Sequence, residues 1–293
     1  MKRTEKIKRY GFFNVDKPSG ITSSTVVNKC KWLTATPCGH LGTLDPLASG
    51  VRPVGVGNAT RLFDYFLEKE KEYIAEFTFG VASDTLDSTG ALTVGGYIPT
   101  EKEIQAVLPS LIGEIAQIPP KYSAKSVNGR RGYDLARAGV DFELAPKKVH
   151  IYDIRMLGKS EAENAYRFQI RCGGGTYIRS IARDIAAALE TNAVMSALCR
   201  TKSGVFTLEN AIPFSLLEQD LPVSEIEQYV IPTESVLPFP ALMLTGKNAE
   251  RIFNGVAVQS EQTDGLYKLY QGETFYGIAQ VQNGMAKAKT KLC

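Results

Sequence analysis

Apolar and polar side chains alternate from Lys71 to Phe79. Successive side chains of a β-strand point to opposite faces of a sheet, so this alternation predicts a strand with one buried face and one partly solvated face. A chain that carries such a strand has to build a sheet and cover one side of it. The apolar positions on the expected buried face are Tyr73, Ala75, Phe77 and Phe79.

Other strands and helices follow in an irregular order rather than as regular strand–helix–strand units, and this order predicts an α+β fold. Thr22 or Ser23, Asn58 and Thr100 are residue types that commonly cap helices, and each precedes a segment with helical apolar spacing. The helix at 176–189 should turn its isoleucines inward and Arg179 and Arg183 elsewhere. The expected strands are residues 10–15, 51–56, 148–156 and 165–172, and the expected helices are residues 22–33, 58–67, 100–111, 133–138 and 176–189.

The pattern changes near Pro232, where three prolines within nine residues suggest a linker. A short helix near 247–253 follows, and then three expected strands at 266–270, 275–281 and 285–289. We therefore predict a larger domain of residues 1–234 and a small, mainly β module of residues 235–293. Within the larger domain, residues 118–140 open with Pro119-Pro120 and contain a short helix of their own, which indicates an insertion.

The composition argues against several protein classes. No run of about eighteen apolar residues occurs, as a membrane span would need, and the basic N-terminus leads into no long apolar segment of a signal peptide. The five cysteines are odd in number and widely spread, which is typical of reduced thiols rather than a disulfide framework. We therefore expect a cytoplasmic protein that has no membrane partner.

The net charge is only +3, but the basic residues are unevenly distributed. Local positive patches can bind phosphates even when the total charge is small, although any single lysine is more often part of a solvated face. The first group lies between residues 121 and 137, and the second between residues 179 and 202. The members are Lys121, Lys125, Arg130, Arg131 and Arg137, and Arg179, Arg183, Arg200 and Lys202.

Three common types of active site find little support. The segment 55–60 precedes a helix, but Thr60 replaces the third glycine of the dinucleotide-binding fingerprint. Gly173-Gly174-Gly175 also precedes a helix but lacks a Gly-Lys-Ser/Thr ending, so both stretches are better explained as turns, although the backbone N–H groups of the second could still bind an RNA phosphate. Two histidines without a Cys-x-x-Cys pair do not make a structural zinc site, and no Gly-x-Ser-x-Gly motif of a hydrolase occurs.

Asp45 lies in a loop, residues 39–47, that is rich in glycine and proline. An aspartate before proline is usually a turn residue, but the surroundings favour chemistry. Glycines 39 and 42 permit unusual backbone angles or a close approach to a ligand, and His40 lies five positions earlier. Apolar neighbours would partly desolvate the carboxylate, which then needs a cation such as arginine to stay ionised. These neighbours are Leu44, Pro46 and Leu47.

Seven segments in this order resemble the TruB family of bacterial tRNA pseudouridine synthases. Together they span about residues 11–215. The resemblance implies a pseudouridine-synthase domain with a mixed, largely antiparallel sheet flanked by helices, an RNA-gripping insertion and a C-terminal module similar to a PUA domain. The segments are Asp16–Gly20, Gly39–Gly50, Lys71–Tyr73, Asp84–Gly90, Pro119–Ala124 with Gly129–Arg137, Gly175–Ser180 and Leu198–Gly204.

The resemblance also implies a function. It is the isomerisation of uridine to pseudouridine at position 55 in the T-loop of tRNA, by base flipping and without a metal or cofactor. In this family pattern Asp45 is the nucleophile or ribose-directed base, Tyr73 stacks under the flipped base and Arg179 pairs with Asp45. Asp87 supports Arg179, and His40 either takes the place of the flipped base in the RNA or holds the flipped strand. Leu198 lines the pocket, and the implied RNA contacts are Lys17, Lys121, Tyr122, Arg130, Arg131 and Arg200.

Two residues depart from the family pattern. Ser126 stands where a lysine is usual, and Arg52 stands where an apolar residue is common. The C-terminal module is short and matches a PUA domain only weakly. We expect a monomer that acts on the T-arm of tRNA with no obligatory protein partner. The alternatives are a tRNA-binding or tRNA-folding protein whose catalysis is secondary, and the same chemistry on another RNA.

Overall fold

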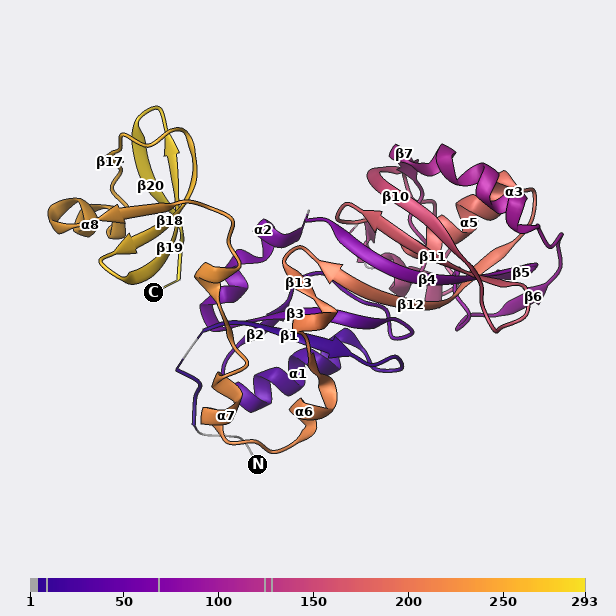
Figure 1. Cartoon of the computed structure of the whole chain (residues 1–293), viewed down its shortest axis with the longest axis horizontal. Helices are drawn as coiled ribbons and strands as arrows, with labels where there is room; N and C mark the ends of the chain where they lie inside the picture. Colours follow the sequence, from indigo (N-terminus) through magenta and orange to yellow (C-terminus); the bar gives the residue numbers. More distant parts are fainter. Residues whose placement is uncertain (1–4, 9, 68, 124, 128, 293) are drawn as a thin grey trace.

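A mixed sheet of eleven strands organises the larger part of the molecule (Figure 1). The computed structural model describes residues 5–8, 10–67, 69–123, 125–127 and 129–292. The main strand order is β14-β1-β3-β12-β4-β11-β10-β7, with β2, β13 and β15 at its sides. These strands are β1 (Gly11–Lys17), β2 (Cys38–His40), β3 (Ser49–Val56), β4 (Lys71–Phe79), β7 (Gly113–Gln117), β10 (Lys147–Lys159), β11 (Ala165–Cys172), β12 (Ala193–Ser203), β13 (Phe206–Thr207), β14 (Ile212–Pro213) and β15 (Ile231–Pro232).

The sheet is largely antiparallel, as the family resemblance implied. Among the described strands of this sheet, only β1 with β14 and β3 with β12 run parallel. The strand expected from the alternation at Lys71–Phe79 is confirmed as β4, whose buried and partly exposed residues alternate without a break. The expected α+β class is confirmed as well.

The sheet consists of two halves that meet between β3 and β12. This contact has only two residue pairs, Ser49 with Cys199 and Gly50 with Arg200, whereas β12 pairs with β4 along most of its length. Gly50 has φ +95°, and a Cβ atom there would lie 2.3 Å from the Arg200 carbonyl oxygen. The close approach of the two strands therefore requires glycine. We call this junction the seam.

Each half of the sheet has a separate apolar core. The half that contains β4, β11 and β12 packs against α3 (Glu101–Val107), the 3-10 turn η2 (Leu108–Leu111) and α5 (Ile178–Ala188). The half that contains β1 and β3 packs against α1 (Ser23–Thr34), α6 (Phe214–Glu218) and α7 (Val223–Glu227). Figure 1 shows these two groups of helices well separated.

Local capping signals were confirmed in two helices and wrong in one. Thr22 caps α1, and Thr100 forms a reciprocal capping box with Glu103 at the start of α3. Asn58 does not cap a helix. It lies inside the 3-10 turn η1 (Gly57–Leu62), which leads into α2 (Phe63–Leu67), and its side-chain amide donates to the carbonyl of Leu292, 2.7 Å away.

The C-terminal residues form a second sheet of five strands, in the order β16-β18-β19-β20-β17, with α8 (Gly246–Phe253) beside it. The mainly β character expected after Pro232 is confirmed. The module shares a core with the main domain, where Ile278 and Leu292 pack with Leu62 and Phe66. Its strands are β16 (Ala241–Leu244), β17 (Val258–Gln259), β18 (Gly265–Gln271), β19 (Thr274–Gln282) and β20 (Met285–Lys291).

Short elements complete the described structure. The insertion at 118–140 contains a two-stranded ribbon and the short helix α4 (Gly132–Arg137), close to the expected helix at 133–138. Among the described helices, none is long and apolar enough to cross a membrane. The remaining elements are β5 (Val81–Ser83), β6 (Leu92–Val94), β8 (Ser126–Val127), β9 (Arg130–Arg131) and the 3-10 turns η3 (Leu208–Asn210) and η4 (Thr233–Ser235).

Candidate active site

The loop that carries Asp45 runs from β2 to β3 and crosses the seam. Its apolar residues Leu44 and Ala48 are buried in the core of the opposite half, against side chains of β4 and α5. The hydroxyl of Ser23 in α1 accepts from the Leu44 amide at 3.0 Å and donates to the Leu44 carbonyl at 2.7 Å. The loop is therefore fixed to both halves of the sheet.

Each carbonyl from Leu44 to Leu47 receives a donor. Beyond the Ser23 bond, the amide of Ala48 donates to Asp45 at 3.1 Å, and the amide of Gly20 donates to Pro46 at 2.8 Å. The hydroxyl of Ser19 donates to Leu47 at 2.6 Å. A loop whose backbone is satisfied this fully holds its side chains in one orientation.

Asp45 and Asp87 both face the guanidinium of Arg179. Arg179 Nε lies 3.0 Å from Asp45 Oδ2, and Arg179 Nη1 lies 3.4 Å from Asp87 Oδ2. Arg179 also donates to the carbonyls of Thr85 at 3.0 Å and Tyr122 at 3.1 Å. Each of its three nitrogens therefore has an acceptor, in the acidic loop, the insertion or the Asp45 loop.

Arg179 is more buried than the apolar spacing of residues 176–189 predicted. We expected α5 to turn Arg179 away from its buried face, yet the residue is only 6% exposed. Two carboxylates and two carbonyls compensate its desolvation, which the apolar periodicity of a single helix cannot reveal.

Opposing effects set the pKa of the Asp45 carboxyl. Burial raises this pKa, the nearby Arg179 guanidinium lowers it and the Asp87 carboxylate raises it again, with a net increase above the ordinary value. About a third of the Asp45 side chain is still exposed, compared with 7% for Arg179. Asp45 is thus the accessible member of the ion pair.

Tyr73 and Arg200 are cross-strand neighbours beside Asp45. They face one another on β4 and β12, and their side chains are hydrogen-bonded. Burial raises the pKa of the Tyr73 phenol to about 12, so the phenol keeps its proton at neutral pH. Leu198, two residues before Arg200, is nearly buried and lies on the same face.

His40 lies at the end of β2, opposite Val54 of β3. Burial and the positive charge of Arg52 lower the pKa of its imidazole to about 4. The ring is therefore neutral near pH 7, a state in which it can stack on a base without the cost of desolvating a charge.

A cavity of about 760 Å³ joins these groups. It is large enough for a nucleotide, and its walls come from both halves of the sheet and from the insertion. The lining includes His40, Asp45, Tyr73, Asp87, Tyr122, Arg179, Leu198 and Arg200.

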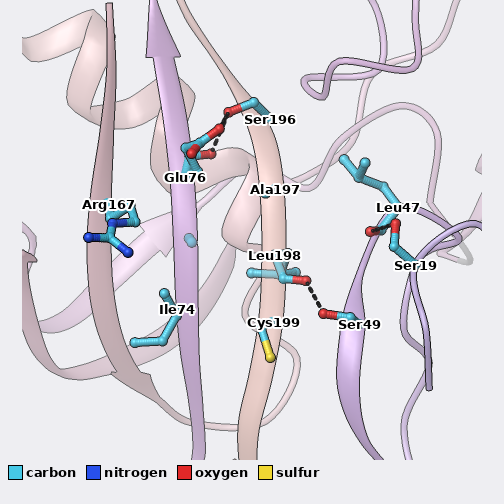
Figure 2. Close-up of a pocket in the computed structure, with 11 residues that line it drawn as sticks. Ser19, Leu47, Ser49, Ile74, Glu76, Arg167, Ser196, Ala197, Leu198 and Cys199 are labelled. Atoms are coloured by element: carbon cyan, nitrogen blue, oxygen red, sulfur yellow. Dashed lines mark hydrogen bonds between the residues drawn. The ribbon is translucent and has the colours of Figure 1, made fainter. Parts of the chain in front are cut away.

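A smaller cavity lies at the seam, and Figure 2 shows how Leu198 borders it. The Ser49 hydroxyl donates to the Leu198 carbonyl at 3.3 Å, across the seam. Glu76 accepts a hydrogen bond from Ser196 nearby, at 2.7 Å. These bonds fix the strand that presents Leu198 to the larger cavity.

Not all of the expected RNA contacts reach this cavity. Lys17 is fully buried and does not line it, because its ammonium donates to the carbonyls of Pro18, Ile21 and Pro46. Our assignment of Lys17 to the RNA is therefore wrong, and its observed contacts brace the Asp45 loop. Lys121 is exposed outside the cavity and pairs with Asp141. The side chains of Arg130 and Arg131 lie outside the described residues.

Two supporting residues escaped the sequence analysis. Ser23 was considered only as a helix cap, although it holds Leu44 from 21 positions away. Gln117 exchanges two hydrogen bonds with the backbone of Tyr177 and so fixes the start of α5, two residues before Arg179. Neither partner can be identified from neighbouring residues, so no local signal was available.

Comparison with known proteins identifies the family. The model of the TruB family pseudouridylate synthases (N-terminal domain) matches residues 31–178, just over half of the chain. The chain belongs to the TruB family. The matched segment contains the Asp45 loop and all of β4, and it ends one residue before Arg179.

TruB relatives match nearly the whole chain. The tRNA pseudouridine synthase B of Clostridium kluyveri is 38% identical over 280 residues, which cover 92% of this chain and 94% of that protein. The enzyme of the same name from Caldanaerobacter subterraneus is 37% identical and covers 95% of this chain and 98% of its own length. The C-terminal module is therefore part of the shared architecture.

Solved structures support the fold of this TruB protein. A chain of the Cbf5-Nop10-Gar1 complex superposes with a TM-score of 0.68 at 24% identity, covering 97% of this chain and 85% of that chain. A chain of the archaeal box H/ACA sRNP Nop10-Cbf5 complex gives 0.69 at 23% identity, with 97% and 86% coverage.

Proposed function

We propose that the protein isomerises uridine to pseudouridine at position 55 in the T-loop of tRNA. The observation that carries this proposal is the partly exposed carboxylate of Asp45, paired with buried Arg179 in a nucleotide-sized cavity beside Tyr73. The relatives named tRNA pseudouridine synthase B, which align over almost the full chain, support tRNA as the substrate.

The reaction rearranges bonds within one nucleotide. The glycosidic bond between C1′ and N1 breaks, the uracil rotates, and C5 bonds to C1′. The proton on C5 leaves and N1 gains one, so the product is an isomer of the substrate. Asp45 acts either at C1′ as a nucleophile or at the ribose as a base, and either role requires the ionised carboxylate that Arg179 stabilises.

The remaining side chains serve base flipping. Removing a base from its stack costs a few kcal/mol, which stacking against an aromatic ring partly offsets. Tyr73 provides that ring in the cavity, and Leu198 packs against the flipped base. Neutral His40 occupies the space that the base leaves in the RNA. Asp87 positions Arg179, since three hydrogen bonds from Thr85 and Thr89 fix its other oxygen.

The surrounding surfaces complete the proposed recognition of RNA. We assign residues 1–234 to catalysis, with the insertion at 118–140 gripping the T-arm through Lys121, Tyr122, Arg130 and Arg131. Residues 235–293 form a PUA-like RNA-binding module. We place the enzyme in the cytoplasm as a monomer without a protein partner. The thiols at 30, 38, 172 and 199, which form no disulfides, fit a reducing compartment.

Asp45→Asn tests the proposal. The change keeps the shape but removes the charge, and we expect pseudouridine formation in a T-arm stem-loop to fall by about four orders of magnitude. Carbodiimide labelling followed by primer extension measures the product at single-turnover enzyme excess. Sequencing of unfractionated RNA treated with the wild-type enzyme identifies any other substrate.

Two outcomes would contradict the proposal. Undiminished activity of Asp45→Asn would remove Asp45 from the chemistry. If wild-type protein forms no pseudouridine in T-arm RNA but binds and refolds tRNA as well as Asp45→Asn does, the protein acts as an RNA-binding or RNA-folding protein. Melting temperatures of both proteins, measured by circular dichroism, control for folding.

A further inference from the structure

Arg179, which pairs with Asp45, is held in part by the insertion. Arg179 Nη2 donates to the carbonyl of Tyr122 at 3.1 Å, and this carbonyl is the acceptor that the described residues offer to that nitrogen. The Arg179 side chain is only 7% exposed, so the loss of this acceptor would leave a buried donor without a partner. The guanidinium would then turn toward its other acceptors, and the contact of its Nε with Asp45 would change.

Helix α5 fixes the first residues of the insertion by side-chain hydrogen bonds. The carbonyl of Ile118 accepts from Ser180 Oγ at 2.9 Å and from Arg183 Nη2 at 3.0 Å. Ser180 is fully buried and lies outside the lining of the large cavity. The insertion therefore begins at a fixed point on the same helix that carries Arg179.

Two prolines connect this fixed point to Tyr122. Pro119 and Pro120 are both buried, and the ring of each proline holds its φ angle at about −65°. The chain between Ile118 and Tyr122 therefore has little freedom to change its direction. A displacement of the Ile118 carbonyl is transmitted to the Tyr122 carbonyl instead of being absorbed between them.

The start of α4 packs against the same segment. The amide of Gly132 donates to the Lys125 carbonyl at 2.8 Å. A Cβ atom added at Gly132 would lie 2.8 Å from the Lys121 carbonyl oxygen, so this approach requires glycine. The backbone around Tyr122 is thus held by both α5 and α4.

We propose that Ser180 is a positioning residue for the reaction, because it fixes the base of the insertion, residues 118–123. The base of the insertion in turn holds Arg179 through the Tyr122 carbonyl, in the orientation that pairs with Asp45. This inference deepens the proposed function and rests on it. An insertion that only grips the RNA would affect affinity, whereas a positioning element affects the turnover of bound RNA.

Ser180→Ala tests this role without changing a group that can touch the RNA. We expect the single-turnover rate on saturating T-arm RNA to fall by about tenfold, because small displacements of groups at a reaction centre slow the chemical step. The dissociation constant of the RNA, measured by filter binding, should stay within about twofold of wild type. Removal of the second donor as well, in Ser180→Ala/Arg183→Gln, should lower the saturated rate further.

The titration of Asp45 gives a readout that a purely structural role would not change. We expect the Asp45 carboxyl to titrate at higher pH in Ser180→Ala than in wild type, because a loosely oriented Arg179 stabilises the ionised form less well. Carbon-13 NMR of protein labelled at the aspartate carboxyl carbons measures this titration without RNA. The spectrum of Asp45→Asn assigns the signal.

Ser110→Ala is the matched control. Ser110 also donates to a backbone carbonyl, that of Val107 at 2.7 Å, but it lies in η2, outside the cavity and the insertion. We expect this change to leave the saturated rate, the RNA affinity and the Asp45 titration as in wild type. Melting temperatures measured by circular dichroism show whether each variant is folded.

The positioning role is overturned if Ser180→Ala turns over saturating RNA within about threefold of wild type, or if Asp45 titrates in it as in wild type. A loss confined to RNA affinity would overturn it as well and would make the insertion a grip only. If Ser180→Ala does not fold, Gly132→Ala replaces it with the same expectations, because the added methyl group displaces the Lys121 carbonyl beside Tyr122.

These outcomes are distinct from a failure of the proposed function. Wild-type protein that forms no pseudouridine in T-arm RNA would refute that function. The Asp45 titration needs no RNA and no turnover, so a shift in Ser180→Ala would still establish the coupling between the insertion and Asp45, and an unchanged titration would still overturn it.

Discussion

The two halves of the main sheet bury apolar side chains, whereas the seam between them buries charge. The core beneath α5 consists of residues such as Phe77, Phe168 and Ile181, all at most 1% exposed. At the seam and in the active site beside it, Arg52, Arg200 and Arg179 are buried to a similar degree. Burial of apolar side chains in the two halves stabilises the fold. Desolvation of the charges at the seam lowers that stability, but it holds these charges where the chemistry requires them.

Removing the central cation should have the largest effect on the seam. Arg179→Met leaves Asp45 and Asp87 facing each other without a counter-ion. We expect turnover to fall by roughly a thousandfold, with RNA affinity nearly unchanged, and stability to fall by about 3–5 kcal/mol. Single-turnover kinetics, filter binding and urea denaturation measure the three quantities. A variant that folds and turns over normally would refute the pairing.

A change in the core of one half should separate stability from chemistry. Phe77 is fully buried and stacks on Phe168, with their ring centroids 4.8 Å apart. Phe77→Ala should cost about 3–5 kcal/mol of unfolding free energy. At temperatures where the variant remains folded, kcat should stay within a few-fold of wild type. A loss of kcat as large as that of Arg179→Met would show that core and seam are not separate.

The pH profile should sharpen the comparison further. Burial raises the pKa of Asp45, and the active form is the ionised one. As pH falls through this pKa, kcat/KM should decline tenfold per pH unit, beginning above the usual range for an aspartate. In Arg179→Met the decline should begin at still higher pH, because the neighbouring positive charge is lost. An unchanged profile in that variant would contradict the electrostatic role of Arg179.

The contact between the main domain and the C-terminal module should show the smallest effect. Asn58 donates to the Leu292 carbonyl and Tyr65 shares a hydrogen bond with Thr290. Asn58→Ala should lower stability by about 1 kcal/mol and leave the single-turnover rate unchanged at saturating RNA. Thermal unfolding followed by calorimetry tests the first statement. A slower saturated rate would link this interface to the seam.

The sequence predicted the fold best where the signals are local. The alternation in β4 and the capping box of α3 involve residues close in the chain, and both predictions were confirmed. The prediction for Asn58 was wrong because its partner lies 234 positions away. The first part of β12 was missed, since register shifts near Met195 and Arg200 interrupt its alternation.

The candidate site was predictable to a different extent. The resemblance pointed to Asp45, Tyr73 and Arg179, and the structure brings these three side chains to one cavity. Their chemical roles stay predictions. The fixation of the Asp45 loop by Ser23 and Lys17 was not predictable, because it depends on how the segment near α1 packs under a loop that follows much later.

The two-pair junction of β3 with β12 has a consequence for how variation in this protein is interpreted. Asp45 is supplied from one side of that junction, and Tyr73 and Arg179 are supplied from the other. The active site is therefore assembled only while the two halves of the sheet keep their relative position. Each half can tolerate core substitutions that preserve its shape. A substitution that shifts one half relative to the other will have the phenotype of an active-site mutation, although every catalytic residue is intact.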